Sequence, residues 1–166
     1  MSANATIRNG TAADVDAVLA LNQDEAKWTS NMTRAGMEAL VGYACLFLVV
    51  EVDGAPAGFV IMIASDSAYP NENLAWFRER YAGFWYVDRI VISKACAGAG
   101  MGRKLYERCF EAARQNGVDQ VVCEYSTEPM NEGSAAFHRA MGFTAVGRKT
   151  DIANGGKQVS MQSRPL

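Results

Sequence analysis

The sequence has little of what metal sites, disulfide frameworks and membrane spans require. It contains a single histidine, His138, and four cysteines that form no Cys-x-x-Cys pair. A zinc site of the usual histidine-rich kinds cannot be assembled from this set, so we expect no metal. Because no secretion signal accompanies the cysteines, we expect them to be reduced residues that pack in the interior.

Long apolar runs and a strong charge bias are also missing. The longest apolar run, Ala44 to Val50, is far shorter than the ~20 residues of a membrane helix. The N-terminal MSANATIRNG lacks the apolar core of a signal peptide. Sixteen basic and 18 acidic side chains leave a net charge of −2, too balanced for a protein that coats nucleic acid. We therefore expect a cytoplasmic protein with no nucleic-acid partner and no membrane partner.

Length and composition favour one globular domain over residues 1–166. The chain has 166 residues, of which 49% are hydrophobic and 20% are charged, values close to globular averages. The charge is uneven, because residues 1–90 carry a net charge of −5 and residues 91–166 carry +3. The first part therefore suits a cationic ligand and the second an anionic one.

Hydrophobic periodicity and turn residues predict an α/β (α+β) fold. Its mixed central sheet has about six to seven strands and is flanked by helices. The predicted strands cover residues 7–8, 44–52, 58–64, 84–93, 120–125, 143–151 and 158–162. The predicted helices cover residues 11–22, 33–41, 74–81, 101–115 and 134–141, with a loop over residues 65–73. Residues 74–81 are expected to be a helical insertion, so a glycine-rich loop separates the fourth strand from the third main helix, residues 101–115.

This loop is the most informative segment of the sequence. Three alternating glycines, Gly98, Gly100 and Gly102, follow the strand that contains Ile90, Val91 and Ile92, and they open a helix. Backbone N–H groups at the positive end of a helix can hold an anion such as pyrophosphate. Glycine lets the backbone approach the phosphates closely.

Two other phosphate-binding patterns fit this loop poorly. A dinucleotide-binding fold needs a small residue at position 103, where the chain has Arg103, and four residues intervene between the strand and the first glycine. A P-loop ends in Gly-Lys-Ser/Thr, which Gly102-Arg103-Lys104 does not match.

The chain resembles the GNAT superfamily of acyl-CoA-dependent N-acyltransferases over about 60 residues, 84 to 143. The shared pattern is a strand, a glycine loop, a helix, a further strand and an Asn, followed by a helix that ends in Gly-Phe. Here the last part reads Asn131 to Phe143, with Phe137-His138 near its end. Two positions depart from the family pattern: Ala97 replaces a usual Gln or Arg, and His138 replaces a common Tyr.

The resemblance implies that acetyl-CoA is the co-substrate. Its carbonyl and pantetheine arm would meet the backbone of Ile90, Val91 and Ile92, and its pyrophosphate would meet the glycine loop and Arg103. Asn131 and Phe137 would contact the pantetheine, and helix capping is the alternative role for Asn131 and Ser134. The implied cofactor-binding residues are Ile90, Val91, Ile92, Gly98, Ala99, Gly100, Met101, Gly102, Arg103, Asn131 and Phe137.

Acetyl transfer to an amine requires a base for the amine and an acid for the leaving thiolate. Glu124 lies where some family members place the base, and Asp88 competes for that role because it shares a strand face with Tyr86. His138 is the candidate acid, since an unperturbed imidazole titrates near neutrality. The alternative is that Glu124 and Asp88 are ordinary solvated carboxylates and that His138 only packs in its helix.

The acceptor side is expected among the aromatic residues 28–86, with Trp28, Tyr86 and Asp88 as candidate substrate-binding residues. An acidic, aromatic surface suits an ammonium group. The acceptor would be an amine of a small molecule, an amino acid or a peptide N-terminus, and a homodimer is possible. The alternatives are a non-catalytic acyl-CoA-binding domain and a structural domain without a ligand.

Overall fold

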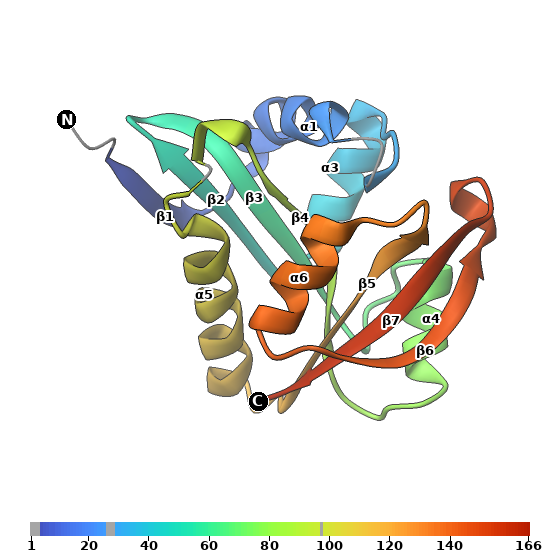
Figure 1. Cartoon of the computed structure of the whole chain (residues 1–166). Coiled ribbons are helices and arrows are strands. Elements are labelled where there is room, and N and C mark those ends of the chain that lie inside the picture. Colours follow the sequence, from blue (N-terminus) through green and yellow to red (C-terminus); the bar gives the residue numbers. More distant parts are fainter. Residues whose placement is uncertain (1–3, 26–28, 97) are drawn as a thin grey trace. The chain divides into compact units, whose positions relative to one another are not determined.

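A computed structural model describes residues 4–25, 29–96 and 98–166 (Figure 1). Over these residues the strands form a mixed seven-stranded sheet in the order β1-β2-β3-β4-β5-β7-β6. The strands are β1 (Ala5–Asn9), β2 (Leu46–Val52), β3 (Ala55–Ala64), β4 (Trp85–Ile92), β5 (Gln120–Glu128), β6 (Thr144–Asp151) and β7 (Lys157–Pro165). The helices are α1 (Val15–Asp24), α3 (Arg34–Tyr43), α4 (Glu72–Arg78), α5 (Met101–Gln115) and α6 (Glu132–Ala140). The predicted α/β class, the number of strands and the glycine loop between the fourth strand and the third main helix are confirmed.

The chain forms two compact units. The first unit comprises Met1–Ile63 and Val87–Cys109, and the second comprises Ala64–Tyr86 and Phe110–Leu166. In the first unit, β1 pairs with β2 and β2 pairs with β3, both antiparallel. The Asp53-Gly54 turn that joins β2 to β3 is the hairpin predicted from the sequence, with positive φ at both residues. Residues 57–63 of β3 are buried without interruption, as a continuous apolar run predicts.

In the second unit, two helices pack on opposite faces of β5. Successive side chains of a strand point to opposite faces, so Glu124 and Tyr125 face different neighbours. Glu124 accepts a hydrogen bond from Asn73 of α4, and the Tyr125 ring lies 5.9 Å from the His138 ring of α6. The strand pairs β5–β7 and β6–β7 are antiparallel, whereas β4 and β5 are parallel through Tyr86 and its neighbour.

Helix α4 approaches β6 closely because β6 carries a glycine there. A Cβ atom on Gly147 would lie 2.5 Å from the ring of Trp76. Any larger residue at this position would displace the indole. Lys149 of β6 and Glu72 of α4 add an ion pair with an N–O distance of 3.8 Å. The contacts place α4, and Asn73 with it, firmly against the sheet of the second unit.

The first helix begins as the sequence predicts. Thr11 and Asp14 form a capping box, and a short 3-10 turn, Ala12–Asp14, precedes α1. Arg8 donates two hydrogen bonds to the Asp14 carboxylate, at 2.7 and 2.8 Å. These bonds lower the pKa of Asp14 to about 2, although burial of the carboxyl acts in the opposite direction. The start of α1 is therefore anchored to β1 by a charged pair.

Two helices begin two residues earlier than predicted, for the same reason. Helix α4 begins at Glu72 rather than Leu74, because the Asn71 side chain accepts a hydrogen bond from the Leu74 N–H and caps the helix. Helix α6 begins at Glu132 rather than Ser134, because Asn131 is its cap. The predicted loop over residues 65–73 was therefore too long, and Asn73 belongs to a helix.

The expectation that the cysteines pack in the interior is wrong for Cys45, which is exposed. All four cysteines are free thiols, and three of them are buried. Burial raises the pKa of the Cys109 thiol to about 12. Within the described ranges, each helix is too short or too polar to cross a membrane.

Candidate functional site

The junction between β4 and α5 has the backbone geometry of an anion-binding loop. After β4 the chain makes a short 3-10 turn, Lys94–Cys96, and α5 begins at Met101. Gly98 and Gly100 have φ values of +80° and +70°, which residues with a side chain rarely adopt. The sequence places glycine where the backbone requires it. Ala97, one of the two departures from the family pattern, lies outside the described residues.

The loop leaves the start of α5 suited to an anionic ligand. The first N–H groups of a helix have no acceptor within the helix, and they lie at the positive end of its dipole. The N–H of Lys104 already donates to the Gly100 carbonyl at 3.1 Å, so the groups before it are the relevant donors. Residues 98–100 and Arg103 are exposed, whereas Val91 is buried and Ile90 and Ile92 are half-buried. The exposed backbone of this junction and the Arg103 side chain are therefore suited to hold an anion such as pyrophosphate.

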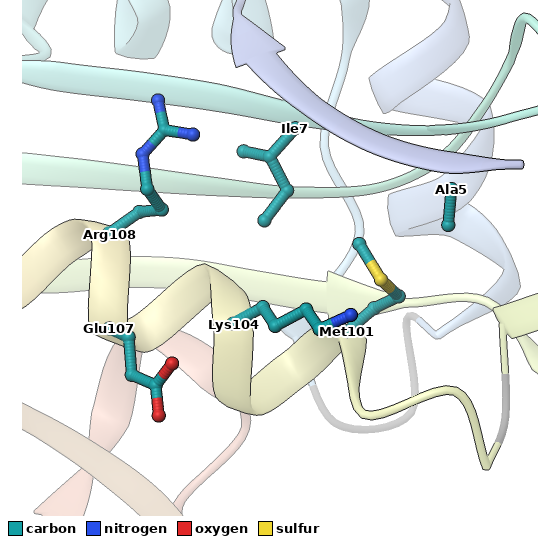
Figure 2. Close-up of a pocket in the computed structure, with 6 residues that line it drawn as sticks. All are labelled: Ala5, Ile7, Met101, Lys104, Glu107 and Arg108. Carbon is teal, nitrogen blue, oxygen red and sulfur yellow. The ribbon is translucent and has the colours of Figure 1, made fainter.

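A cavity of about 370 Å³ lies in the first unit between β1 and α5 (Figure 2). Its lining combines apolar side chains with charges of both signs. The residues are Ala5, Ile7, Met101, Lys104, Glu107 and Arg108. Lys104 lines this cavity but Arg103 does not, so the two cations that follow the glycines face different surroundings. The mixed charge of the lining selects no class of ligand.

Glu124 lies at the centre of a hydrogen-bonded cluster in the second unit. The Tyr86 hydroxyl donates to Glu124 Oε1 at 2.8 Å, and Asn73 Nδ2 donates to the same oxygen at 3.0 Å. Tyr86 is 1% exposed and Asn73 is 5% exposed, whereas Glu124 is only partly buried. Two buried donors therefore hold Oε1 of the carboxylate, and its other oxygen, Oε2, is shielded from solvent as well. The structure brings together the predicted residues Tyr86 and Glu124.

A second carboxylate, Asp151, joins this cluster. Asn73 Nδ2 lies 3.5 Å from Asp151 Oδ2, and Asn154 Nδ2 donates to the same oxygen at 2.7 Å. Asp151 is 5% exposed and stands at the end of β6. The resulting cluster of Tyr86, Glu124, Asn73 and Asp151 is called the carboxylate cluster below.

Asp88, the other candidate base, is occupied by a structural ion pair. Arg89 Nε lies 3.3 Å from Asp88 Oδ2, and the Asp88 side chain is 4% exposed. The same guanidinium donates to Asn22 Oδ1 at 2.9 Å and to the carbonyl of Ser30 at 3.2 Å. Arg89 therefore fastens the segment after α1 to β4. Trp28, a predicted substrate-binding residue, lies outside the described residues.

His138 is buried among aromatic rings. It is 4% exposed, and its ring lies 5.9 Å from Tyr125 and 5.2 Å from Phe143. The Nδ1 atom lies 2.8 Å from the Ser134 carbonyl oxygen, so Nδ1 must carry the proton of the neutral ring. Burial lowers the pKa of His138, although the bond to Ser134 acts in the opposite direction. These surroundings favour the neutral, packed form.

Asn131 and Phe137 lie on the same helix, α6. Asn131 Oδ1 accepts a hydrogen bond from the Ser134 N–H at 3.1 Å and thereby caps the helix. A cap of this kind uses the amide oxygen and turns it toward the helix, so a contact with a pantetheine carbonyl would use the amide NH₂ as donor. Phe137 is half-buried, and its ring stands edge-on to His138 at 5.5 Å.

A comparison with models of protein families shows to which family the chain belongs. The model of the Acetyltransferase (GNAT) family matches residues 16–143. The chain belongs to the GNAT acetyltransferase family. The match spans parts of both compact units and includes the glycine loop and Glu124. The family predicted from the sequence is confirmed.

Solved structures of GNAT proteins share the fold at low sequence identity. Ard1 from Thermoplasma volcanium has a TM-score of 0.80 and 17% identity, with 98% of this chain and 97% of that chain covered. The ribosomal-protein-S18-alanine N-acetyltransferase of Escherichia coli has a TM-score of 0.74 and 16% identity, with 98% and 94% covered. The yncA protein of Salmonella typhimurium, solved with its cofactor acetyl-CoA, has a TM-score of 0.70 and 20% identity, with 98% and 94% covered. No curated protein matches the sequence significantly.

For this GNAT protein, sequence reasoning missed Asn73 and Asp151. Asn73 fell within a predicted loop, and Asp151 was the last residue of a predicted strand. Asn73 contacts Asp151 and Glu124 across sequence separations of 78 and 51 residues. One local signal was present, because Asn71 precedes Leu74 at the spacing of a helix cap and so extends α4 over Asn73.

Proposed function

We propose that this GNAT protein transfers the acetyl group of acetyl-CoA to a primary amine by direct attack in a ternary complex. The amine belongs to a small molecule, an amino acid or a peptide N-terminus. The observation that carries the proposal is the partly buried Glu124 side chain, whose Oε1 receives two hydrogen bonds from buried donors while its Oε2 is shielded from solvent. A positioned carboxylate of this kind suits a general base.

In the proposed reaction, Glu124 accepts a proton from the ammonium form of the acceptor, either directly or through one water. The neutral amine nitrogen then forms a bond with the acetyl carbonyl carbon, the carbon–sulfur bond breaks, and the nitrogen releases its extra proton to solvent. The leaving thiolate takes a proton from solvent, since an ordinary thiol with a pKa of about 8.5 is protonated at pH 7. The products are the acetylated amine and the free thiol of CoA.

Acetyl-CoA supplies the activated acetyl group, and we assign its binding to residues on two parts of the sequence. The backbone of residues 98–102 and the Arg103 side chain hold the pyrophosphate. The backbone of residues 90–92 meets the pantetheine arm. Asn131 donates its amide NH₂ to a pantetheine carbonyl, and Phe137 packs along the arm. The positive φ values of Gly98 and Gly100 support the first assignment.

The chemistry of the acceptor is less constrained than that of the donor. Similar structures are named for different acceptors, including an alanine of ribosomal protein S18 and phosphinothricin. We keep Trp28, Tyr86 and Asp88 as proposed contacts of the acceptor side, with Tyr86 acting through its bond to Glu124. The net charge of −5 over residues 1–90 favours an acceptor that arrives as a cation. A cytoplasmic location and a homodimer stay predictions.

Two measurements separate catalysis from binding alone. A thermal shift with acetyl-CoA tests whether the thioester is bound at all. Release of the CoA thiol in the presence of a panel of amines then tests transfer. The proposal expects both signals. Stabilisation by acetyl-CoA without thiol release from any amine would favour the alternative, a non-catalytic acyl-CoA-binding domain.

Glu124→Gln tests the assignment of the base. The glutamine keeps the volume of the side chain but cannot accept the proton. We expect kcat/KM for the amine to fall roughly 10²-fold near pH 7, with unchanged affinity for acetyl-CoA. The loss should narrow as the pH approaches about 10, where an alkyl amine loses its proton to solvent. Glu128→Gln, a change of the same kind at the exposed end of β5, is the matched control. Equal activity of Glu124→Gln and the control at every pH would exclude Glu124 as the base.

A further inference from the structure

Asn73 joins the two carboxylates of the carboxylate cluster. Its Nδ2 atom donates to Glu124 Oε1 at 3.0 Å and lies 3.5 Å from Asp151 Oδ2. The residue is 5% exposed and stands in the first turn of α4, whose cap is Asn71. Neither the sequence pattern nor the family match assigns a role to Asn73.

The direction of the Asn73 amide is set by Asp151. The amide presents its NH₂ group to one side and its oxygen to the other. A reversed amide would put its oxygen against two carboxylate oxygens, which repel it. Asp151 is itself held in place, because Asn154 donates to its side chain at 2.7 Å and the Gly156 N–H donates to its carbonyl at 2.9 Å.

The direction of Asn73 in turn sets the orientation of Glu124. Both of its buried donors, Tyr86 and Asn73, reach the same oxygen, Oε1. With one oxygen held from two directions, the plane of the carboxylate is fixed, and so is the direction of the second oxygen. The rate of proton transfer depends on such alignment, and small misplacements of a catalytic group are costly.

We propose that Asn73 is a positioning residue for Glu124 and that Asp151 fixes the direction of its amide. The inference rests on the proposed function, because it assumes that Glu124 is the base. Asn73 acts through Glu124 and does not touch the acceptor. Its loss therefore lowers kcat for the amine and leaves the KM for acetyl-CoA unchanged.

The main test is Asn73→Asp, which keeps the shape of the side chain and replaces the NH₂ donor with a carboxylate oxygen. We expect kcat to fall roughly 10²-fold, since a third carboxylate turns Glu124 away from its position. Asn73→Ala, which removes the donor without adding charge, should lose about tenfold. Thermal unfolding checks that both variants are folded. If only packing mattered, the isosteric Asn73→Asp would keep full activity, and that result would overturn the inference.

Asn71→Ala is the matched control on the same helix. It removes the cap of α4, a bond of 2.9 Å to the Leu74 N–H, but no contact with Glu124. We expect a loss of about 1 kcal/mol in stability and a kcat within twofold of the wild type. A kcat loss in Asn71→Ala equal to that of Asn73→Ala would assign the effect to helix stability and overturn the inference.

A double variant separates this inference from the proposed function. In the Glu124→Gln background there is no base to position, so adding Asn73→Ala should lower kcat no further. An additive loss would overturn the positioning role while leaving Glu124 as the base. Full activity of Glu124→Gln alone would overturn the proposed base, whatever Asn73 does.

Discussion

The glycine loop and the carboxylate cluster hold their functional groups in different ways. The loop is built from consecutive residues, 98–103, and its proposed function depends on backbone N–H groups and on the positive φ angles of Gly98 and Gly100. The cluster is built from side chains on α4, β4, β5 and the end of β6. A local backbone site is encoded in one stretch of sequence. A side-chain site is encoded in the fold, and each member looks ordinary on its own.

This difference explains what the sequence could predict. Alternating glycines at the start of a helix have few other uses, and the structure has the loop with Gly98 and Gly100, and α5 with Gly102 in its first turn, where they were expected. Glu124 was visible only through the resemblance to the GNAT family. Asn73 and Asp151 were not visible, because nothing local distinguishes a buried amide near a helix start from a solvated one. Contacts across 51 and 78 residues follow only from the packing of α4.

Residues that were selected for their chemical type show the same contrast between local sequence and fold. His138 was selected because a lone histidine near a thioester could act as an acid. Its aromatic neighbours and its bond to Ser134 were unpredictable, and they favour the neutral ring. Asn131 was expected to contact pantetheine, with a helix cap as the alternative role, and the structure has it as the cap of α6. Residue type suggests a function, but burial decides what the group can do.

The largest expected effect is on acetyl-CoA affinity and comes from a substitution in the glycine loop. In Gly100→Val, the branched side chain is incompatible with a φ of +70°, so the loop changes shape and its N–H groups move. We expect acetyl-CoA affinity, measured by calorimetry, to fall well over tenfold while the fold persists. Gly54→Val in the β2–β3 turn is the matched control, since its φ is +82° and a Cβ at either glycine meets no atom within 4 Å. Both variants lose stability by similar amounts, but the control should bind acetyl-CoA within twofold of the wild type. Equal acetyl-CoA affinities of the two variants would show that this loop does not bind the pyrophosphate.

A smaller effect separates the two roles of Asn131. Asn131→Asp keeps an oxygen to cap α6 and loses the NH₂ donor proposed for pantetheine. We expect acetyl-CoA affinity to fall roughly three- to tenfold, the value of one hydrogen bond, with an unchanged melting temperature. Asn131→Ala loses the cap as well, which should cost about 1 kcal/mol and roughly 2–4 °C in melting temperature. If Asn131→Asp binds acetyl-CoA as well as the wild type, Asn131 is a cap and nothing more.

The smallest expected effect concerns His138 and its role in stability. Since the folded protein lowers the pKa of His138 below the unfolded value near 6.5, the unfolded state binds more protons as the pH falls through 6.5. The contribution of His138 to the free energy of unfolding is therefore fully present above that pH and declines below it. Relative to His138→Phe, which cannot titrate, the wild type should lose up to about 1 kcal/mol between pH 7.5 and 5.5 in urea unfolding. The test compares how the free energy of unfolding changes with pH in the two proteins, because all other groups titrate equally in both. A wild type that instead gains stability toward pH 5.5 would mean that the fold favours the imidazolium. That outcome would restore His138 as the proton donor to the leaving thiolate.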